Sequence, residues 1–91
     1  MNLRAEARDR DCQVRLVGVC NGDRSTVCLA HFRLAGISGM SMKSPDFIGA
    51  WTCSACHAVV DSDKSPEVQL DFAHGVFRTQ AQLIRERELH L

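Results

Sequence analysis

Four cysteines in this sequence have the residue type and spacing of a metal site. Cys53 and Cys56 are separated by two residues, the commonest spacing for two thiolates on one tetrahedral metal, although such a pair can also be a redox dithiol. Cys12 and Cys20 supply a looser second pair, with seven residues between them. Four thiolates fill the shell of a zinc ion and leave no position for water. We therefore predict a structural Zn²⁺ on these cysteines, against the alternative of four reduced buried thiols.

The remaining cysteine and the histidines suggest other chemistry. Cys28 lies in an apolar, strand-like run, where a buried free thiol is expected. His57 follows Cys56 directly and Asp61 comes four residues later, so the two could share a divalent cation or form an ordinary surface pair. His31, in an apolar context, is either a core histidine or a general base that acts on water at a strand end.

The composition sets broad limits on the class of protein. The 91 residues predict one domain, 1–91. A domain this small buries little surface, so stabilisation by a bound metal ion is favoured. Lys and Arg number 11, as do Asp and Glu, so net charge argues neither for nor against a nucleic-acid partner. No apolar run approaches the ~20 residues of a membrane span, and the charged N-terminus lacks a signal core. We therefore expect no membrane partner and a reducing cytoplasm, where thiols meet metals more often than each other.

The elements that must position these residues predict an α+β fold. Residues 3–10 are compatible with a helix, residues 26–34 and 47–52 with two strands, and residues 53–61 with a second helix. Ser65 and Pro66 are typical of a helix start, and we expect a long helix over roughly 66–88. An apolar stripe at helical spacing is expected to face the core; it consists of Leu70, Ala73, Phe77 and Ile84, with Val76 and Leu83 adjacent.

The order of these anchors resembles the HNH, or His-Me finger, endonucleases, and more closely the small YbcO-type "putative nucleases" of lambdoid prophages. The resemblance covers almost the whole chain. It is carried by Cys12-Gln13-Val14-Arg15, Gly18-Val19-Cys20-Asn21-Gly22, Leu29-Ala30-His31, Pro45-Asp46 and Cys53-Ser54-Ala55-Cys56-His57. It implies a zinc-stapled ββα-metal core, in which two antiparallel strands and a helix surround one catalytic ion, Mg²⁺ or a similar divalent cation.

The resemblance also implies roles for individual residues. It assigns the roles of general base, loop-holding residue and ligand of the catalytic ion to His31, Asp46 and His57 respectively. HNH enzymes often carry an aspartate just before the first histidine as a second metal ligand, but this chain has Ala30 there. Another group, Asp61 or His74, would then have to complete the metal site.

Two functions from different classes follow. The first is a metal-dependent DNA endonuclease, in which Arg15, Arg33 and Lys43 are candidate phosphate contacts, although each is equally compatible with a solvated surface cation. The alternative is a non-catalytic, zinc-stabilised module that binds nucleic acid or protein in a phage recombination or replication assembly; Ala30 and the neutral net charge favour it. Catalysis requires His31 and His57 to face one cleft, away from the zinc.

Overall fold

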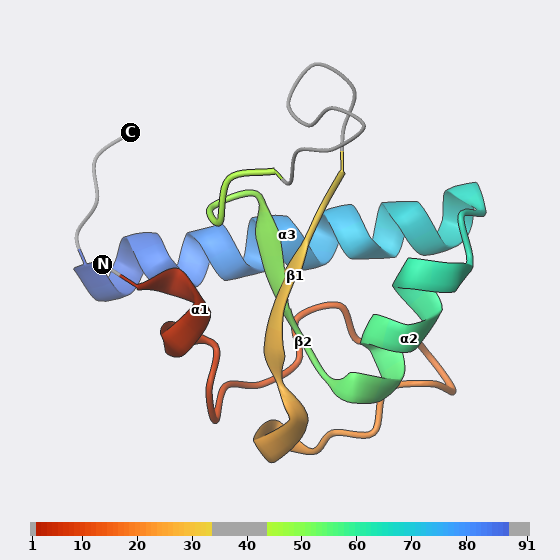
Figure 1. Cartoon of the computed structure of the whole chain (residues 1–91), viewed down its shortest axis with the longest axis horizontal. Coiled ribbons are helices and arrows are strands. Elements are labelled where there is room, and N and C mark those ends of the chain that lie inside the picture. Colours follow the sequence, from red (N-terminus) through yellow and green to blue (C-terminus); the bar gives the residue numbers. More distant parts are fainter. Residues whose placement is uncertain (1, 34–43, 88–91) are drawn as a thin grey trace.

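The computed structural model describes residues 2–33 and 44–87 and shows a small α+β fold. Residue 87 is described by its backbone alone. The elements in chain order are α1 (Leu3–Glu6), a 3₁₀ helix η1 (Arg24–Thr26), β1 (Cys28–His31), β2 (Gly49–Thr52), α2 (Ser54–Ser62) and α3 (Pro66–Arg87). The two strands cross in front of the long helix α3, with α1 and α2 on opposite sides of them (Figure 1). In the described part of the chain, no helix is both long and apolar enough to cross a membrane.

The two strands form an antiparallel pair whose register places His31 opposite Gly49. Phe32 N–H extends this pairing by donating to the Ile48 carbonyl at 2.9 Å. Gly49 is required because a Cβ atom here would lie 2.9 Å from a Leu29 methyl group and 3.2 Å from the Asp46 carbonyl. The absence of a side chain at Gly49 lets the Asp46 loop lie close to the end of β1, where His31 is located.

The helices begin close to the predicted positions. α2 follows β2 directly, and Cys53 is its N-cap, where the side-chain sulfur accepts from Cys56 N–H. α3 begins at Pro66, as predicted, and Asp63 stabilises the preceding turn by accepting from Ser65 N–H at 2.9 Å. The N-terminal helix is shorter than residues 3–10 because it ends at Glu6, and Asp9 then adopts a left-handed backbone with φ of 58°.

The predicted core face of α3 is wrong. Leu70 and Phe77 are 56% and 64% exposed, whereas the buried positions of the helix are Phe72, Gly75, Val76, Thr79 and Leu83. Thr79 can be buried because its hydroxyl accepts from Trp51 N–H at 3.0 Å and donates to the Gly75 carbonyl at 2.9 Å. Gly75 is needed because a Cβ atom would meet a Val14 methyl group at 2.8 Å. Hydrogen bonding and close backbone contact therefore select the face that packs on β2.

This packing predicts opposite outcomes for two phenylalanines of α3. Phe72 is 4% exposed and its ring lies 4.9 Å from the ring of Phe32, so Phe72→Ala should cost about 3–5 kcal/mol of unfolding free energy. Phe77→Ala removes the same atoms from an exposed site and should change stability by less than about 0.5 kcal/mol. Denaturant or thermal unfolding of the two variants measures the difference, and equal destabilisation would contradict the observed face.

Candidate functional site

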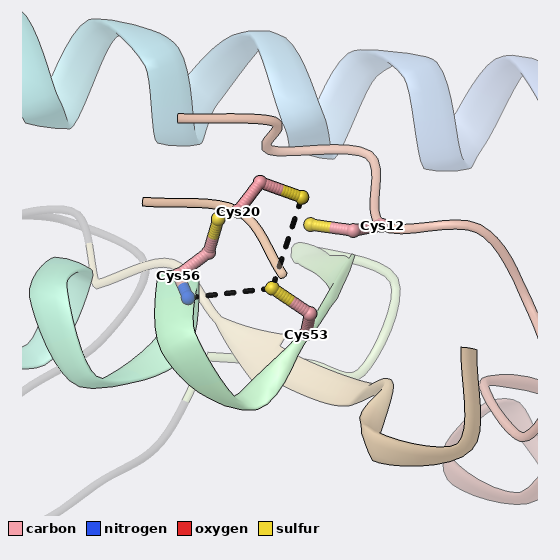
Figure 2. Close-up of side chains that lie close together, drawn as sticks. All are labelled: Cys12, Cys20, Cys53 and Cys56. Atoms are coloured by element: carbon pink, nitrogen blue, oxygen red, sulfur yellow. Dashed lines mark hydrogen bonds between the residues drawn. The ribbon is translucent and has the colours of Figure 1, made fainter. Parts of the chain in front are cut away.

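The four cysteines predicted to bind metal converge on one point of the structure (Figure 2). Their sulfur atoms all lie within 4.8 Å of one another, and the Cys53 and Cys20 sulfurs are 3.9 Å apart. Four sulfurs at ~2.3 Å from one zinc ion stand about 3.8 Å apart, so the observed spacing suits a tetrahedral metal. Cys12 and Cys20 come from the segment after α1, and Cys53 and Cys56 from the start of α2. The cluster could therefore hold a metal ion that ties these two segments together.

The ionisation of these thiols also fits a metal. Burial by itself raises the pKa of Cys53, but backbone N–H groups of Cys56 and Asn21 outweigh burial and bring this pKa to about 7. Burial raises the pKa of both Cys20 and Cys56. Four thiolates in so small a volume need a compensating positive charge, which a divalent cation supplies.

Apart from the cysteine cluster, His31 and Asp46 form a polar pair at the opposite end of β1 from Cys28. The His31 Nε2 and Asp46 Oδ1 atoms are 2.7 Å apart, and the His31 side chain is only 15% exposed. The hydrogen bond from His31 holds the pKa of Asp46 below its usual range, and Arg4, whose Nε lies 3.4 Å from the same oxygen, adds to the effect. Asp46 is therefore an ionised carboxylate that can only accept, so the hydrogen bond assigns a proton to Nε2 of His31 and leaves Nδ1 as the ring nitrogen that could act as a base.

His57 lies between a carboxylate and a thiol. Its Nε2 atom is 3.3 Å from Asp61 Oδ2, and its Nδ1 atom is 3.1 Å from the sulfur of Cys28. Two adjacent ligands of an octahedral cation at ~2.1 Å stand about 3.0 Å apart, so Nε2 and Oδ2 are spaced to bind one cation together. The other ring nitrogen of a metal-bound histidine normally bonds a second group, and Cys28 occupies that position.

Cys28 is a free cysteine outside the sulfur cluster, as expected, but the expectation that it is buried is wrong, because the residue is exposed. The strand that carries it pairs with β2 on one side only, so the first residue of β1 remains open to solvent beside α2. Desolvation of the sulfur, and then the charge of Asp61, raise the pKa of Cys28, so the thiol keeps its proton at neutral pH.

One residue of each histidine–aspartate pair, His31 and Asp61, lines a pocket of about 170 Å³. Its lining residues lie at or just after the end of β1, at or just after the end of α2, and at the start of α3; they are His31, Arg33, Asp61, Lys64, Gln69 and Phe72. His57 contacts the lining residue Asp61 but is not itself part of the lining. The four cysteines do not line it, so the pocket and the thiol cluster are separate sites.

Comparison with known proteins connects this arrangement to a family. Residues 1–88 match the family described as "Putative nuclease YbcO". The chain belongs to the YbcO family. Over 90 residues it is 43% identical to the protein of that name from Escherichia coli K-12 and equally to one from Enterobacteria phage 82, with 93% of each chain covered. A solved structure from Escherichia coli K-12, titled "a putative bacteriophage protein", superposes with a TM-score of 0.76 at 36% identity, covering 94% of this chain and all of the other.

The structure of this YbcO-family chain brings only part of the predicted catalytic set together. His31 and Asp61 line one pocket, Asp46 contacts His31, and His57 contacts Asp61 but does not itself line the pocket. His74 is exposed on α3 and does not line the pocket. Within residues 2–33 and 44–87, the four cysteines form the only group of three or more candidate ligands close enough to share an ion, so His57, Asp61 and His74 do not form such a group.

The predicted phosphate contacts are divided between two places. Arg33 lines the pocket beside His31, whereas Arg15 lines a different groove next to α3. Lys43 lies outside the described residues. Sequence reasoning missed Lys64 and Gln69, which line the pocket. Lys64 lies three residues after Asp61, just past the end of α2, and this position in the sequence could have identified it as a candidate.

Proposed function

We propose that this YbcO-family protein is a metal-dependent endonuclease that hydrolyses phosphodiester bonds of DNA. Its HNH-type core would consist of β1, β2 and α2, within the single domain 1–91. The observation that carries the proposal is the pocket in which His31, a candidate general base, lies beside Asp61, a candidate cation ligand that contacts His57. Proton transfer and cation binding at one phosphate are the two functions that hydrolysis requires.

The residues of the pocket suggest how each would act. Nδ1 of His31 takes a proton from a water molecule while the water oxygen forms a bond to phosphorus and the bond to the leaving sugar oxygen breaks. The leaving oxygen takes a proton from solvent. Mg²⁺ or a similar ion, held by His57 and Asp61, would stabilise the negative charge that develops on the phosphate and the leaving oxygen. Asp46 positions His31 through the 2.7 Å hydrogen bond.

Two cations of the pocket are suited to hold the phosphate. Arg33 is exposed at the pocket, and its guanidinium can donate two parallel hydrogen bonds to phosphate oxygens. Lys64 Nζ donates to the Val60 carbonyl at 3.0 Å, which positions the ammonium group and leaves its other protons for a ligand.

The metal on the four cysteines is proposed to be zinc with a structural role. A tetrahedral set of four sulfurs is typical of zinc, and the set leaves no position for water or substrate. Three of the four cysteines are buried, so the site lies within the core and not at the pocket. Zinc would fix the start of α2, and with it the backbone of His57.

One observation favours the non-catalytic alternative, a zinc-stabilised binding module of a phage recombination or replication assembly. Ala30 is 1% exposed and buried against the core, so the position where HNH enzymes often carry an acidic ligand contributes none. The candidate catalytic ion would then have two protein ligands, His57 and Asp61, and would depend on water and the phosphate for the rest of its shell.

Nicking of supercoiled plasmid DNA distinguishes the two functions. The protein is expected to convert supercoiled plasmid to nicked or linear forms with added Mg²⁺ or Mn²⁺ and to be inactive without them. His31→Ala should abolish this conversion, while Phe77→Ala, purified in parallel, controls for a contaminating nuclease. DNA binding without cleavage at any Mg²⁺ or Mn²⁺ concentration would support the binding module and refute the nuclease.

A further inference from the structure

A second, larger groove lies away from the candidate catalytic pocket and is rich in arginine. It has a volume of about 540 Å³ and is formed by the segment after α1, by η1, by Trp51 of β2 and by the second half of α3. Five of its lining residues are arginines, namely Arg10, Arg15, Arg24, Arg78 and Arg85. In a chain whose acidic and basic residues are equal in number, five arginines around one groove are a local concentration of positive charge. We call this surface the basic groove.

The acidic residues of the basic groove are already paired. Asp11 Oδ1 lies 3.3 Å from Arg24 Nε, and Glu86 pairs with Arg10, whose guanidinium also stacks over Trp51 at 4.5 Å. The other three arginines, all exposed, hydrogen-bond only neutral groups within the described part of the chain; they are Arg15, Arg78 and Arg85. Three guanidinium groups therefore face the groove with no acidic partner among the described residues.

The groove is also held in shape before any ligand binds. Gln13 N–H donates to the Trp51 carbonyl at 2.7 Å, and Arg78 donates to the Gln13 carbonyl, so the segment after α1 is fixed to both β2 and α3. Arg15 has a left-handed backbone with φ of 55°, which is uncommon for a residue with a long side chain and is maintained here by this packing. A rigid set of guanidinium groups loses little entropy when it binds phosphates.

We infer that the basic groove is a second nucleic-acid contact site, which binds the phosphodiester backbone of DNA away from the bond that is cut. The catalytic pocket uses Gln69 and Phe72 at the start of α3, whereas the groove uses residues around Gln82, which lie about 15 Å further along the helix. This inference rests on DNA being the substrate of the proposed function, but it does not require cleavage. The groove sets affinity and salt dependence, while the pocket performs hydrolysis.

The test is the salt dependence of binding to a short fluorescein-labelled DNA duplex, measured by anisotropy without added divalent cation. Each phosphate contact contributes about 0.9 to the slope of log affinity against log salt concentration. Arg85→Gln should lower the slope by about 1 and weaken binding several-fold, because Arg85 donates only to Gln82 and its loss leaves the fold intact. Arg85→Lys should keep most of the slope. Arg8→Gln, which removes an exposed arginine outside the groove, is the matched control and should keep the wild-type slope.

Equal slopes for Arg85→Gln and Arg8→Gln, or no measurable binding by the wild type at low salt, would overturn the inference. If Arg85→Gln proves less stable in a thermal melt, Arg15→Gln serves as the second groove variant, since Arg15 is exposed and also has no acidic partner among the described residues. Failure of the proposed function looks different. His31→Ala should bind DNA with the wild-type slope. If the wild-type protein binds DNA through the groove but does not cleave it, the nuclease is refuted and the groove is not.

Discussion

Replacing Cys53 with serine is expected to prevent binding of the proposed structural zinc and to unfold the domain. Cys53 belongs to the sulfur cluster and also caps α2, so the change removes a metal ligand and weakens the start of the helix that carries His57. Structural zinc contributes about 10–16 kcal/mol of apparent binding free energy in small zinc domains, as much as or more than the ~5–15 kcal/mol of stability typical of a folded domain. A chain of 91 residues has little core to offset that loss.

Metal analysis and circular dichroism of the purified variants measure this effect. Wild type should contain one zinc per chain and melt cooperatively, whereas Cys53→Ser should contain none and show no cooperative transition. Cys28→Ser is the matched control, because Cys28 lies outside the cluster, and it should retain one zinc per chain. Full zinc occupancy in Cys53→Ser would show that the four sulfurs are not the metal site.

Replacing His31 or His57 with alanine is expected to impair cleavage in two different ways. His31 acts as a base and does not bind the ion, so His31→Ala should lower the cleavage rate by roughly 10²–10⁴ with little change in the Mn²⁺ requirement. His57 is 3.3 Å from Asp61 and would bind the ion with it, so His57→Ala should raise the Mn²⁺ concentration needed for activity. High Mn²⁺ should then restore part of the activity of His57→Ala and none of that of His31→Ala.

A titration of plasmid cleavage against Mn²⁺ for both variants, with zinc content measured in the same samples, tests this division of roles. Both variants should retain the structural zinc, because neither histidine belongs to the sulfur cluster. The same Mn²⁺ dependence in both would show that one of the two assigned roles is wrong. Wild-type cleavage by both would show that neither histidine takes part in cleavage and would remove the candidate pocket from the mechanism.

The sequence by itself determined the features that depend on residue type and on local spacing. Cysteine thiolates are common metal ligands in proteins. The two-residue spacing of Cys53 and Cys56 places both at the start of one helix, so the members of the sulfur cluster could be predicted before the fold was known. The start of α3 at Pro66 followed in the same way, because proline lacks an N–H that the first turn of a helix does not use. The two strands and the second helix were likewise predicted to within a few residues.

Only the tertiary structure decided which surfaces meet. The apolar stripe of α3 predicted the wrong buried face, because hydropathy counts Thr79 as a poor core residue while the folded chain supplies Trp51 N–H, 28 residues away, to satisfy its hydroxyl. The contact between Cys28 and His57 and the pocket shared by His31 and Asp61 each join β1 to α2, which are distant in sequence. Such contacts depend on how β1 and α2 are placed around β2, and this placement cannot be predicted from the spacing of residues within either segment.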